Sequence, residues 1–203
     1  MDIDSEEFWT DYYETVKDRP PRPTLLEALS YFDKDPKQLK KVAIDLGAGV
    51  GNDTRELISR GWEVYAFDAT SSAMKYIRTG LSQENLELLK TMVTRFENII
   101  LPKGVSLINA SYSIPFCSPA EFPALWEKIT TSLASGGRFC GHIFGNEDEW
   151  ASSETMTFFT RHAAEQLFEG FELEKFWEEN QIGKVASGAS KHWHLFHIVA
   201  RKK

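Results

Sequence analysis

Three glycines at alternate positions within residues 45–54 (DLGAGVGNDT) constrain the fold more than any other feature of this sequence. A short apolar stretch, residues 42–45, precedes them, and a helical pattern over residues 53–60 follows. Glycine lets the backbone turn sharply and lets a ligand approach where other residues carry a Cβ. The helix that follows offers unpaired backbone N–H groups. This order predicts an open α/β sheet with a ligand site at the carboxyl ends of its strands.

The rest of the chain continues the alternation of strands and helices. Helices are expected from Ser71 or Ser72, from Ser118 (followed by Pro119 and Glu121), and over residues 160–169; Gly136 and Gly137 should close the second of these. The expected strands are apolar on both faces, which is typical of a parallel sheet covered by helices on both sides. They are residues 42–45, 62–68, 90–94, 105–111, 138–144, 172–178 and 192–201.

The first 41 residues form a separate helical pattern. Aromatic and apolar residues from Phe8 to Val16 recur at helical spacing, and Asp4 and Glu7 are placed like a capping box. The prolines of residues 20–23 must end that helix, and a second one is expected from Thr24. We therefore predict a helical cap over residues 1–41 and a ligand-binding domain over residues 42–203.

Composition and charge indicate which kind of partner the chain binds: a small molecule, a nucleic acid or a membrane. The chain has 203 residues, a formal net charge of -7 and no basic cluster of the kind that binds nucleic acid, so a small-molecule substrate is favoured. No apolar run reaches the length of a membrane span, and the acidic start of the chain lacks the pattern of a signal peptide. We expect a cytoplasmic protein with buried free thiols at Cys117 and Cys140; the oligomeric state is left open.

The charges around the glycines distinguish two classes of ligand. A dinucleotide-binding turn reads G-x-G-x-x-G, whereas here Asn52 stands in place of the third glycine. Carboxylates at Asp45 and Asp53 would repel a pyrophosphate. They suit a ligand with positive charge and no phosphate, and S-adenosylmethionine (SAM) is such a ligand. Two alternatives remain: a nicotinamide-dependent oxidoreductase, and a SAM-binding module without catalytic activity.

These residues resemble the class I SAM-dependent methyltransferase family. Residues 45–51 (DLGAGVG) match its first motif, and Asp68, at the end of WEVYAFD, matches the acid that holds both ribose hydroxyls. The resemblance covers residues 42–200 and is closest to the small-molecule enzymes of the tellurite-resistance and thiopurine types. It implies a single doubly wound, Rossmann-like domain whose seven strands lie in the order 3-2-1-4-5-7-6, and it implies SAM as the cofactor.

The resemblance also assigns residues to the cofactor. Gly47, Ala48 and Gly49 would contact its methionine part, Ala69 its adenosine, and Arg95 and Phe96 the adenine ring, at a point where many members have an aspartate. Ser111 and Asn109 would lie beside the transferred methyl group. With Asp45 and Asp68, the expected cofactor residues are Asp45, Gly47, Ala48, Gly49, Asp68, Ala69, Arg95, Phe96, Asn109 and Ser111.

The loops after the fourth and fifth strands carry the candidate acceptor residues, because function gathers at those strand ends. They are Tyr112, His142, Phe144 and Trp150, with Phe116 beside them. His142 is either a general base or a core histidine. Methyl transfer is an in-line displacement that depends on alignment, and the sequence contains no catalytic triad.

Other residues keep two interpretations each. Tyr12 and Tyr13 either close over the sulfonium or pack on the core, and Arg19 and Arg22 either bind the SAM carboxylate or lie in solvent. The histidines of residues 192–197 do not make up the four ligands of a closed zinc site, so no metal is expected. Residues 180–191 are polar and rich in glycine and serine, which predicts a mobile loop.

Overall fold

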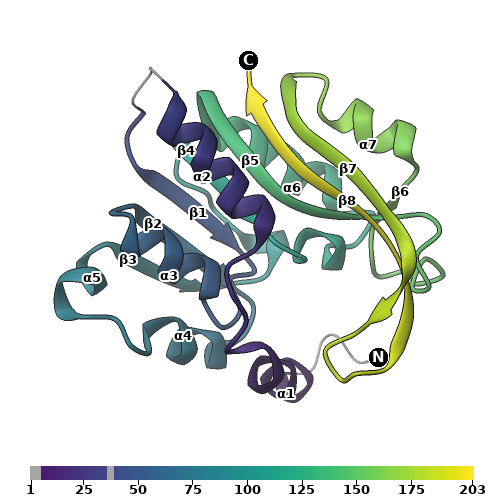
Figure 1. Ribbon diagram of the computed structural model, residues 1–203, viewed down its shortest axis with the longest axis horizontal. Helices are drawn as coiled ribbons and strands as arrows, with labels where there is room; N and C mark the ends of the chain where they lie inside the picture. Colours follow the sequence, from purple (N-terminus) through teal and green to yellow (C-terminus); the bar gives the residue numbers. More distant parts are fainter. Residues whose placement is uncertain (1–5, 36–38) are drawn as a thin grey trace.

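A computed structural model describes residues 6–35 and 39–203 as one mixed sheet with helices on both faces (Figure 1). The strands lie in the order β3-β2-β1-β4-β5-β8-β7; β1 to β5 are parallel, and β8 runs antiparallel to both β5 and β7. The expected order is confirmed, with one addition: a two-residue strand, β6, pairs with β5. The strands are β1 (Val42–Leu46), β2 (Glu63–Asp68), β3 (Leu89–Val93), β4 (Val105–Ala110), β5 (Leu133–Gly145), β6 (Phe158–Phe159), β7 (Phe171–Lys184) and β8 (Ser190–Lys202).

Alternate side chains of the central strands enter two different cores. In β1, Ala43 packs with the helices α2 and α3, whereas Ile44 packs with α6 and α7 on the opposite face. Because both faces are covered, both residues are fully buried. The helices are α1 (Glu6–Val16), α2 (Pro23–Lys34), α3 (Asn52–Ser59), α4 (Ser71–Arg78), α5 (Gln83–Glu87), α6 (Phe122–Ser132) and α7 (Arg161–Leu167), with short 3-10 helices at Phe96–Asn98 and Ile114–Phe116.

The two N-terminal helices have different neighbours. Leu25 and Leu29 of α2 belong to the core on one face of the sheet, so this helix is one of the layers of the fold. Helix α1 lies instead below the carboxyl ends of the strands, where Tyr13 and Val16 pack with Val50 (Figure 1). The division at residue 41 stays a prediction, and Asp4 of the expected capping box lies outside the described residues.

Several boundaries differ from those expected. Helix α2 begins at Pro23, one residue before Thr24. Helix α6 begins at Phe122 rather than Pro119, because the backbone N–H of Glu121 bonds to the carbonyl of Ser118 and closes a turn there. Gly136 and Gly137 lie within β5, which starts directly after α6 at Leu133, so they do not end the helix.

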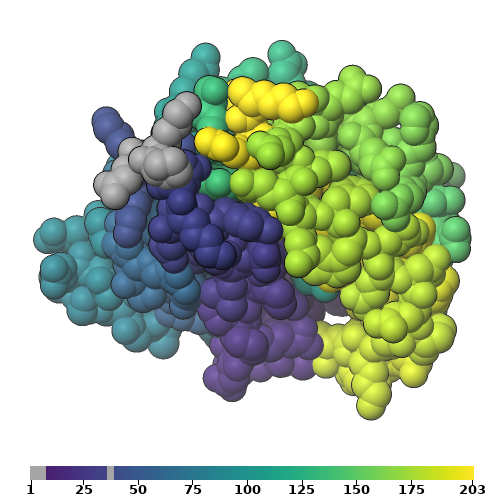
Figure 2. Space-filling view, turned by 45° about the horizontal axis from the view of Figure 1, so that its top comes forward, coloured from purple at the N-terminus to yellow at the C-terminus, as the bar shows by residue number. Residues whose placement is uncertain are grey.

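The prediction of a mobile loop over residues 180–191 is wrong. Strands β7 and β8 stay paired from Phe171 with Lys202 to Lys184 with Ser190, and only residues 185–189 form the turn. The polar composition of this segment fits an exposed hairpin at the edge of the sheet as well as it fits a loop. The tip of the hairpin reaches the same end of the molecule as α1 (Figures 1 and 2), and Ala186 packs against the cluster around Tyr13.

Within residues 6–35 and 39–203, no helix has both the length and the apolar character that crossing a membrane requires. Cys117 and Cys140 are free and buried, as expected.

Candidate active site

The glycine turn, residues 47–51, follows β1 directly. Gly47, Gly49 and Gly51 have φ angles of 67°, 52° and 80°, in the left-handed region that favours glycine. The turn also passes close to the loop after β4, since a Cβ on Gly47 would lie 2.4 Å from the Cβ of Ser113. The sequence therefore needs glycine at residue 47 for two reasons, backbone conformation and space.

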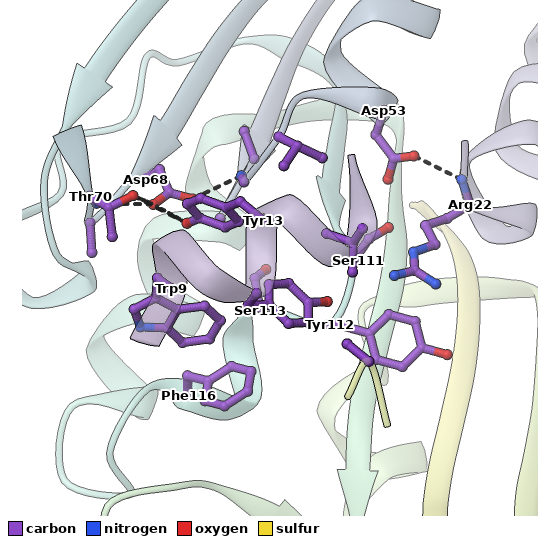
Figure 3. Close-up of a pocket in the computed structure, with 18 of the residues that line it drawn as sticks. Trp9, Tyr13, Arg22, Asp53, Asp68, Thr70, Ser111, Tyr112, Ser113 and Phe116 are labelled. Atoms are coloured by element: carbon purple, nitrogen blue, oxygen red, sulfur yellow. Dashed lines mark hydrogen bonds between the residues drawn. The ribbon is translucent and has the colours of Figure 1, made fainter. Parts of the chain in front are cut away.

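Asp68 ends β2 beside this turn and accepts hydrogen bonds on both carboxylate oxygens (Figure 3). Oδ2 accepts from the backbone N–H of Gly49 at 2.8 Å. Oδ1 accepts from the backbone N–H and hydroxyl of Thr70, at 3.0 and 2.9 Å, and from the hydroxyl of Tyr13 at 2.9 Å. The last contact joins α1 to the glycine turn through one carboxylate.

Tyr13 belongs to a buried apolar cluster and also lines the candidate site. Its side chain is 3% exposed, and its ring lies 3.3 Å from where a Cβ of Gly49 would stand. Burial, followed by the charge of Asp68, raises the pKa of Tyr13 far above its ordinary value. The phenol is therefore protonated at neutral pH and acts as the donor in its bond to Asp68. Tyr12 lines the same cavity without being fully buried.

A buried acidic pair lies on the other side of the glycine turn. The Asn109 amide donates to Asp45 Oδ1 at 2.8 Å and to Asp53 Oδ2 at 2.9 Å, and the Thr54 hydroxyl donates to Asp45 Oδ2 at 2.5 Å. Burial, followed by the charge of Asp53, raises the pKa of Asp45 to about 7. Two carboxylates held this close in a cavity wall are suited to a positively charged ligand.

Tyr112 is one of several aromatic residues that line the other end of the cavity. Its φ of 57° is unusual for a residue other than glycine and is of the kind that structures retain at functional sites. The ring stacks on His142, with centroids 4.0 Å apart, and the guanidinium carbon of Arg22 lies 4.5 Å from its centroid. We call the rings at this end the acceptor wall: Tyr112, Phe116, Phe144, Trp150 and Trp193.

His142 lies behind this wall, with 1% of its surface exposed. Its Nδ1 has no hydrogen-bond partner among the described residues, and burial lowers its pKa well below the ordinary value. A neutral imidazole stacked on Tyr112 supports that ring and does not itself line the cavity. His142 therefore has no surface at the cavity through which it could contact an acceptor, and its predicted contact stays a prediction.

One cavity of about 630 Å³ joins these parts, within the range of small-molecule sites. The predicted site residues line it except for His142 and Asn109, which is fully buried and holds the acidic pair from behind. Arg19 and Arg22 also line it. The cavity is also lined by residues that were not predicted: Thr70, Ser113, residues 183–187 and Trp193. Thr70 and Ser113 directly follow predicted residues, whereas residues 183–187 and Trp193 reach the cavity through the packing of the β7–β8 hairpin.

The C-terminal histidines make pairwise contacts. His194 Nε2 lies 2.8 Å from Glu178 and His197 Nε2 lies 3.0 Å from Glu179, so the two imidazoles have separate carboxylate partners. Among residues 6–35 and 39–203, no group of three His, Cys, Asp or Glu side chains is arranged to hold a metal ion.

The chain is similar to known methyltransferases. A family model described as "Methyltransferase domain" matches residues 43–137. A phosphoethanolamine N-methyltransferase from Triticum aestivum is 28% identical over 147 residues, which cover 72% of this chain and 27% of that protein. The chain thus spans about a quarter of the length of this relative.

Solved structures support the fold. TehB from Haemophilus influenzae superposes with a TM-score of 0.70 at 14% identity, covering 87% of this chain and 62% of that chain. A 1,6-didemethyltoxoflavin-N1-methyltransferase from Burkholderia thailandensis, solved with 1,6-didemethyltoxoflavin and S-adenosylhomocysteine, superposes with a TM-score of 0.65 at 17% identity, covering 98% and 87%.

The site suits the cofactor that this family uses. Asp68 places a carboxylate at the cavity wall, and the acidic pair suits positive charge. The Ser113 hydroxyl, also at this wall, is buried and has no hydrogen-bond partner among residues 6–35 and 39–203. The sequence motif, the sheet order, the family match and this donor set agree. Residues 43–137 thus match a methyltransferase domain, the chain has the sheet order of the Rossmann-like methyltransferase fold, and S-adenosylmethionine is the cofactor that this site suits.

Proposed function

We propose that this protein transfers the methyl group of SAM to a small-molecule acceptor by in-line displacement. The observation that carries the proposal is the single cavity, which has the glycine turn and Asp68 at one end and the acceptor wall at the other. A cofactor held at the first end and an acceptor held at the second would face each other inside the cavity. The methyl group would then pass between them without crossing bulk solvent.

Each part of the cavity has a proposed role toward the cofactor. Asp68 accepts the ribose hydroxyls, and residues 47–49 contact the methionine part through their backbone. Ala69, Arg95 and Phe96 surround the adenine, since all three line the cavity beyond β2 and β3. Arg22, whose backbone N–H donates to Asp53 at 2.8 Å, reaches the cofactor carboxylate, and Arg19 contributes from the same wall.

SAM supplies a methyl group already activated on a sulfonium, so the chain's own work is alignment and the exclusion of water. We assign this work to Tyr112, fixed between Arg22 and His142, and to α1, which lies over the glycine turn. No described residue is assigned as a general base. A Tyr112→Phe enzyme should keep its turnover, because the role assigned to Tyr112 uses its ring and not its hydroxyl.

The first test is calorimetric titration with SAM and, separately, with NAD. Saturable binding of SAM and none of NAD supports the proposal, whereas binding of NAD, or of neither, overturns it. Turnover on a panel of thiol, phenol, heteroaromatic and amine acceptors, phosphoethanolamine included, then separates an enzyme from a module that only binds SAM.

Asp68→Ala tests the ribose assignment. We expect SAM affinity to fall by about 2–3 kcal/mol, the scale for hydroxyls left without a partner. Asp33→Ala, on the exposed surface of α2, is the matched control and should bind as the unchanged protein does. An Asp68→Ala protein that melts cooperatively and binds SAM with unchanged affinity would remove this assignment.

A further inference from the structure

A buried lysine lies directly behind the acceptor wall. Lys191, near the start of β8, is 2% exposed and does not line the cavity. Its ammonium pairs with the carboxylate of Asp148, in the turn after β5. That carboxylate also accepts from the backbone N–H of Trp150 at 3.0 Å and from that of His194 at 3.1 Å. The ion pair therefore fixes both the turn and the strand that carry the wall.

The ammonium of Lys191 is enclosed by rings of the wall. Its Nζ lies 3.8 Å from the ring centroid of Trp193, 4.2 Å from that of Trp150 and 5.7 Å from that of Phe144. All three rings line the cavity, whereas Lys191 does not. The rings therefore contact both the cavity and the buried lysine. At these distances an ammonium is attracted by the electron-rich face of the ring.

A second cation lies on the same wall. The Arg22 guanidinium is 4.5 Å from the centroid of Tyr112, so the faces of Tyr112, Trp150 and Trp193 each have a cation of the protein against them. Carboxylates also line the cavity. Asp45, Asp53 and Asp68 flank the glycine turn, Glu97 follows β3, and Asp11 lies on α1. Glu179, bonded to His197, is close enough to Tyr112 for the two side chains to interact electrostatically.

This arrangement bears on the charge of the acceptor. An aromatic wall recognises a cationic ligand by offering it unoccupied ring faces. Here those faces already interact with Lys191 and Arg22, so they do not offer a cation the unoccupied electron-rich face that it would need. An uncharged planar ring does not need a vacant electron-rich face, because it can pack edge-to-face or offset against aromatic side chains.

We propose that the acceptor is a planar aromatic or heteroaromatic molecule without positive charge, and that Lys191 is a specificity-determining residue that excludes cationic acceptors. The proposal rests on the proposed function, because it takes the acceptor wall as the place where the acceptor binds. Lys191 acts from behind the wall, through Trp150 and Trp193, and takes no part in the transfer itself.

The test compares two planar probes of similar size: quinoline, and N-methylquinolinium, which carries one N-methyl group and one positive charge more. Both are titrated calorimetrically, at a pH where quinoline is uncharged, into protein saturated with S-adenosylhomocysteine. We expect the wild-type protein to bind quinoline at least about tenfold more tightly. In the double variant Lys191→Met/Asp148→Asn, which removes both buried charges, this preference should fall to near unity.

Lys175→Met is the matched control. Lys175 also lies over a tryptophan, with Nζ 5.5 Å from the Trp177 centroid, but Trp177 does not line the cavity. This variant should keep the wild-type preference. Equal or tighter binding of N-methylquinolinium to the wild-type protein, an unchanged preference in a folded double variant, or no binding of either ring would each overturn the proposal.

If the double variant does not melt cooperatively, the proposal is decided by the affinities of quinoline and N-methylquinolinium for the wild-type protein. Binding of S-adenosylhomocysteine is measured first. Its absence would count against the proposed function. Its presence together with a preference for the cation would overturn the inference about the acceptor and Lys191 and leave the proposed function standing.

Discussion

Tyr13 donates its hydroxyl hydrogen to the carboxylate that we assign to the ribose, so it competes with the cofactor. Oδ1 of Asp68 accepts three hydrogen bonds from Tyr13 and Thr70, and Oδ2 accepts that of Gly49. Two ribose hydroxyls would have to displace or share these donors.

Tyr13→Phe should therefore tighten SAM binding while making the ligand-free protein less stable. Each effect should be about 1 kcal/mol, the net value of one hydrogen bond, which is roughly a fivefold change in affinity. Calorimetry and urea unfolding measure the two effects. Weaker binding by the variant would mean that the hydroxyl contacts the cofactor instead of competing with it.

Asp45 should make cofactor binding depend on pH. Its pKa is raised from 3.8 to about 7, so the folded, ligand-free protein holds a proton that the unfolded chain has lost, and stability falls as pH rises through that window. A positively charged ligand favours the carboxylate and must release this proton. SAM affinity should therefore rise with pH, by up to about tenfold per unit, and level off above about pH 7.

Titrations over a pH series, in two buffers of different ionisation enthalpy, report both the affinity and the released proton. Asp45→Asn is the control and should give a flatter profile. An affinity that decreases as pH rises to 7 would contradict the assignment of positive charge to this part of the site.

Among the elements, those specified by local signals were the ones that the sequence predicted well. The apolar run of β1, the glycine turn and Asp68 at the end of β2 are adjacent features, and their placement follows from backbone conformation and strand direction alone. The helix predicted over residues 160–169 is α7, Arg161–Leu167, and the hydroxyl of Thr160 caps it by accepting from the N–H of Ala163.

Elements that depend on distant partners were predicted poorly. Much of β7 is exposed and polar, so its length is set by pairing with β8 and not by an apolar pattern of its own. Residues 118–121 fit either a helix start or a turn, and the structure uses the turn. Trp193 reaches the cavity through the packing of the β7–β8 hairpin, which no neighbouring residue signals.

Substitutions at Gly61, which follows α3, and at Gly47, in the glycine turn, separate the effect of backbone conformation from the effect of space. Gly61 has a φ of 76°, and a Cβ added there would meet nothing within 4 Å, so Gly61→Ala should lose only the left-handed strain, about 1–2 kcal/mol. Gly47→Ala meets the same strain and the Ser113 side chain, and should lose about 1–3 kcal/mol more. Urea unfolding of both variants measures this difference, and equal losses would show that the loop after β4 moves aside freely.

For the whole molecule, the cavity is a meeting point of segments far apart in the chain. Its lining runs from Phe8 in α1, through the glycine turn and the loop after β4, to the β7–β8 hairpin and Leu195. The hairpin tip and α1 lie at the same end of the molecule (Figure 2). A ligand that contacts all of these segments binds the folded state and has no comparable site in the unfolded chain.

Such a ligand should raise the melting temperature as a mass-action effect. At a free SAM concentration of about one hundred times Kd, the folded state gains about 2.7 kcal/mol. For a domain of this size that corresponds to an increase of roughly 5–10 °C. Thermal unfolding with SAM measures the increase, and NAD at the same concentration should leave the transition unchanged. In Asp68→Ala the increase should be largely lost, because a loss of about 2–3 kcal/mol raises Kd by about thirty- to 160-fold and brings it close to the ligand concentration. An equal increase in that variant would mean that the ligand stabilises the protein from a different site.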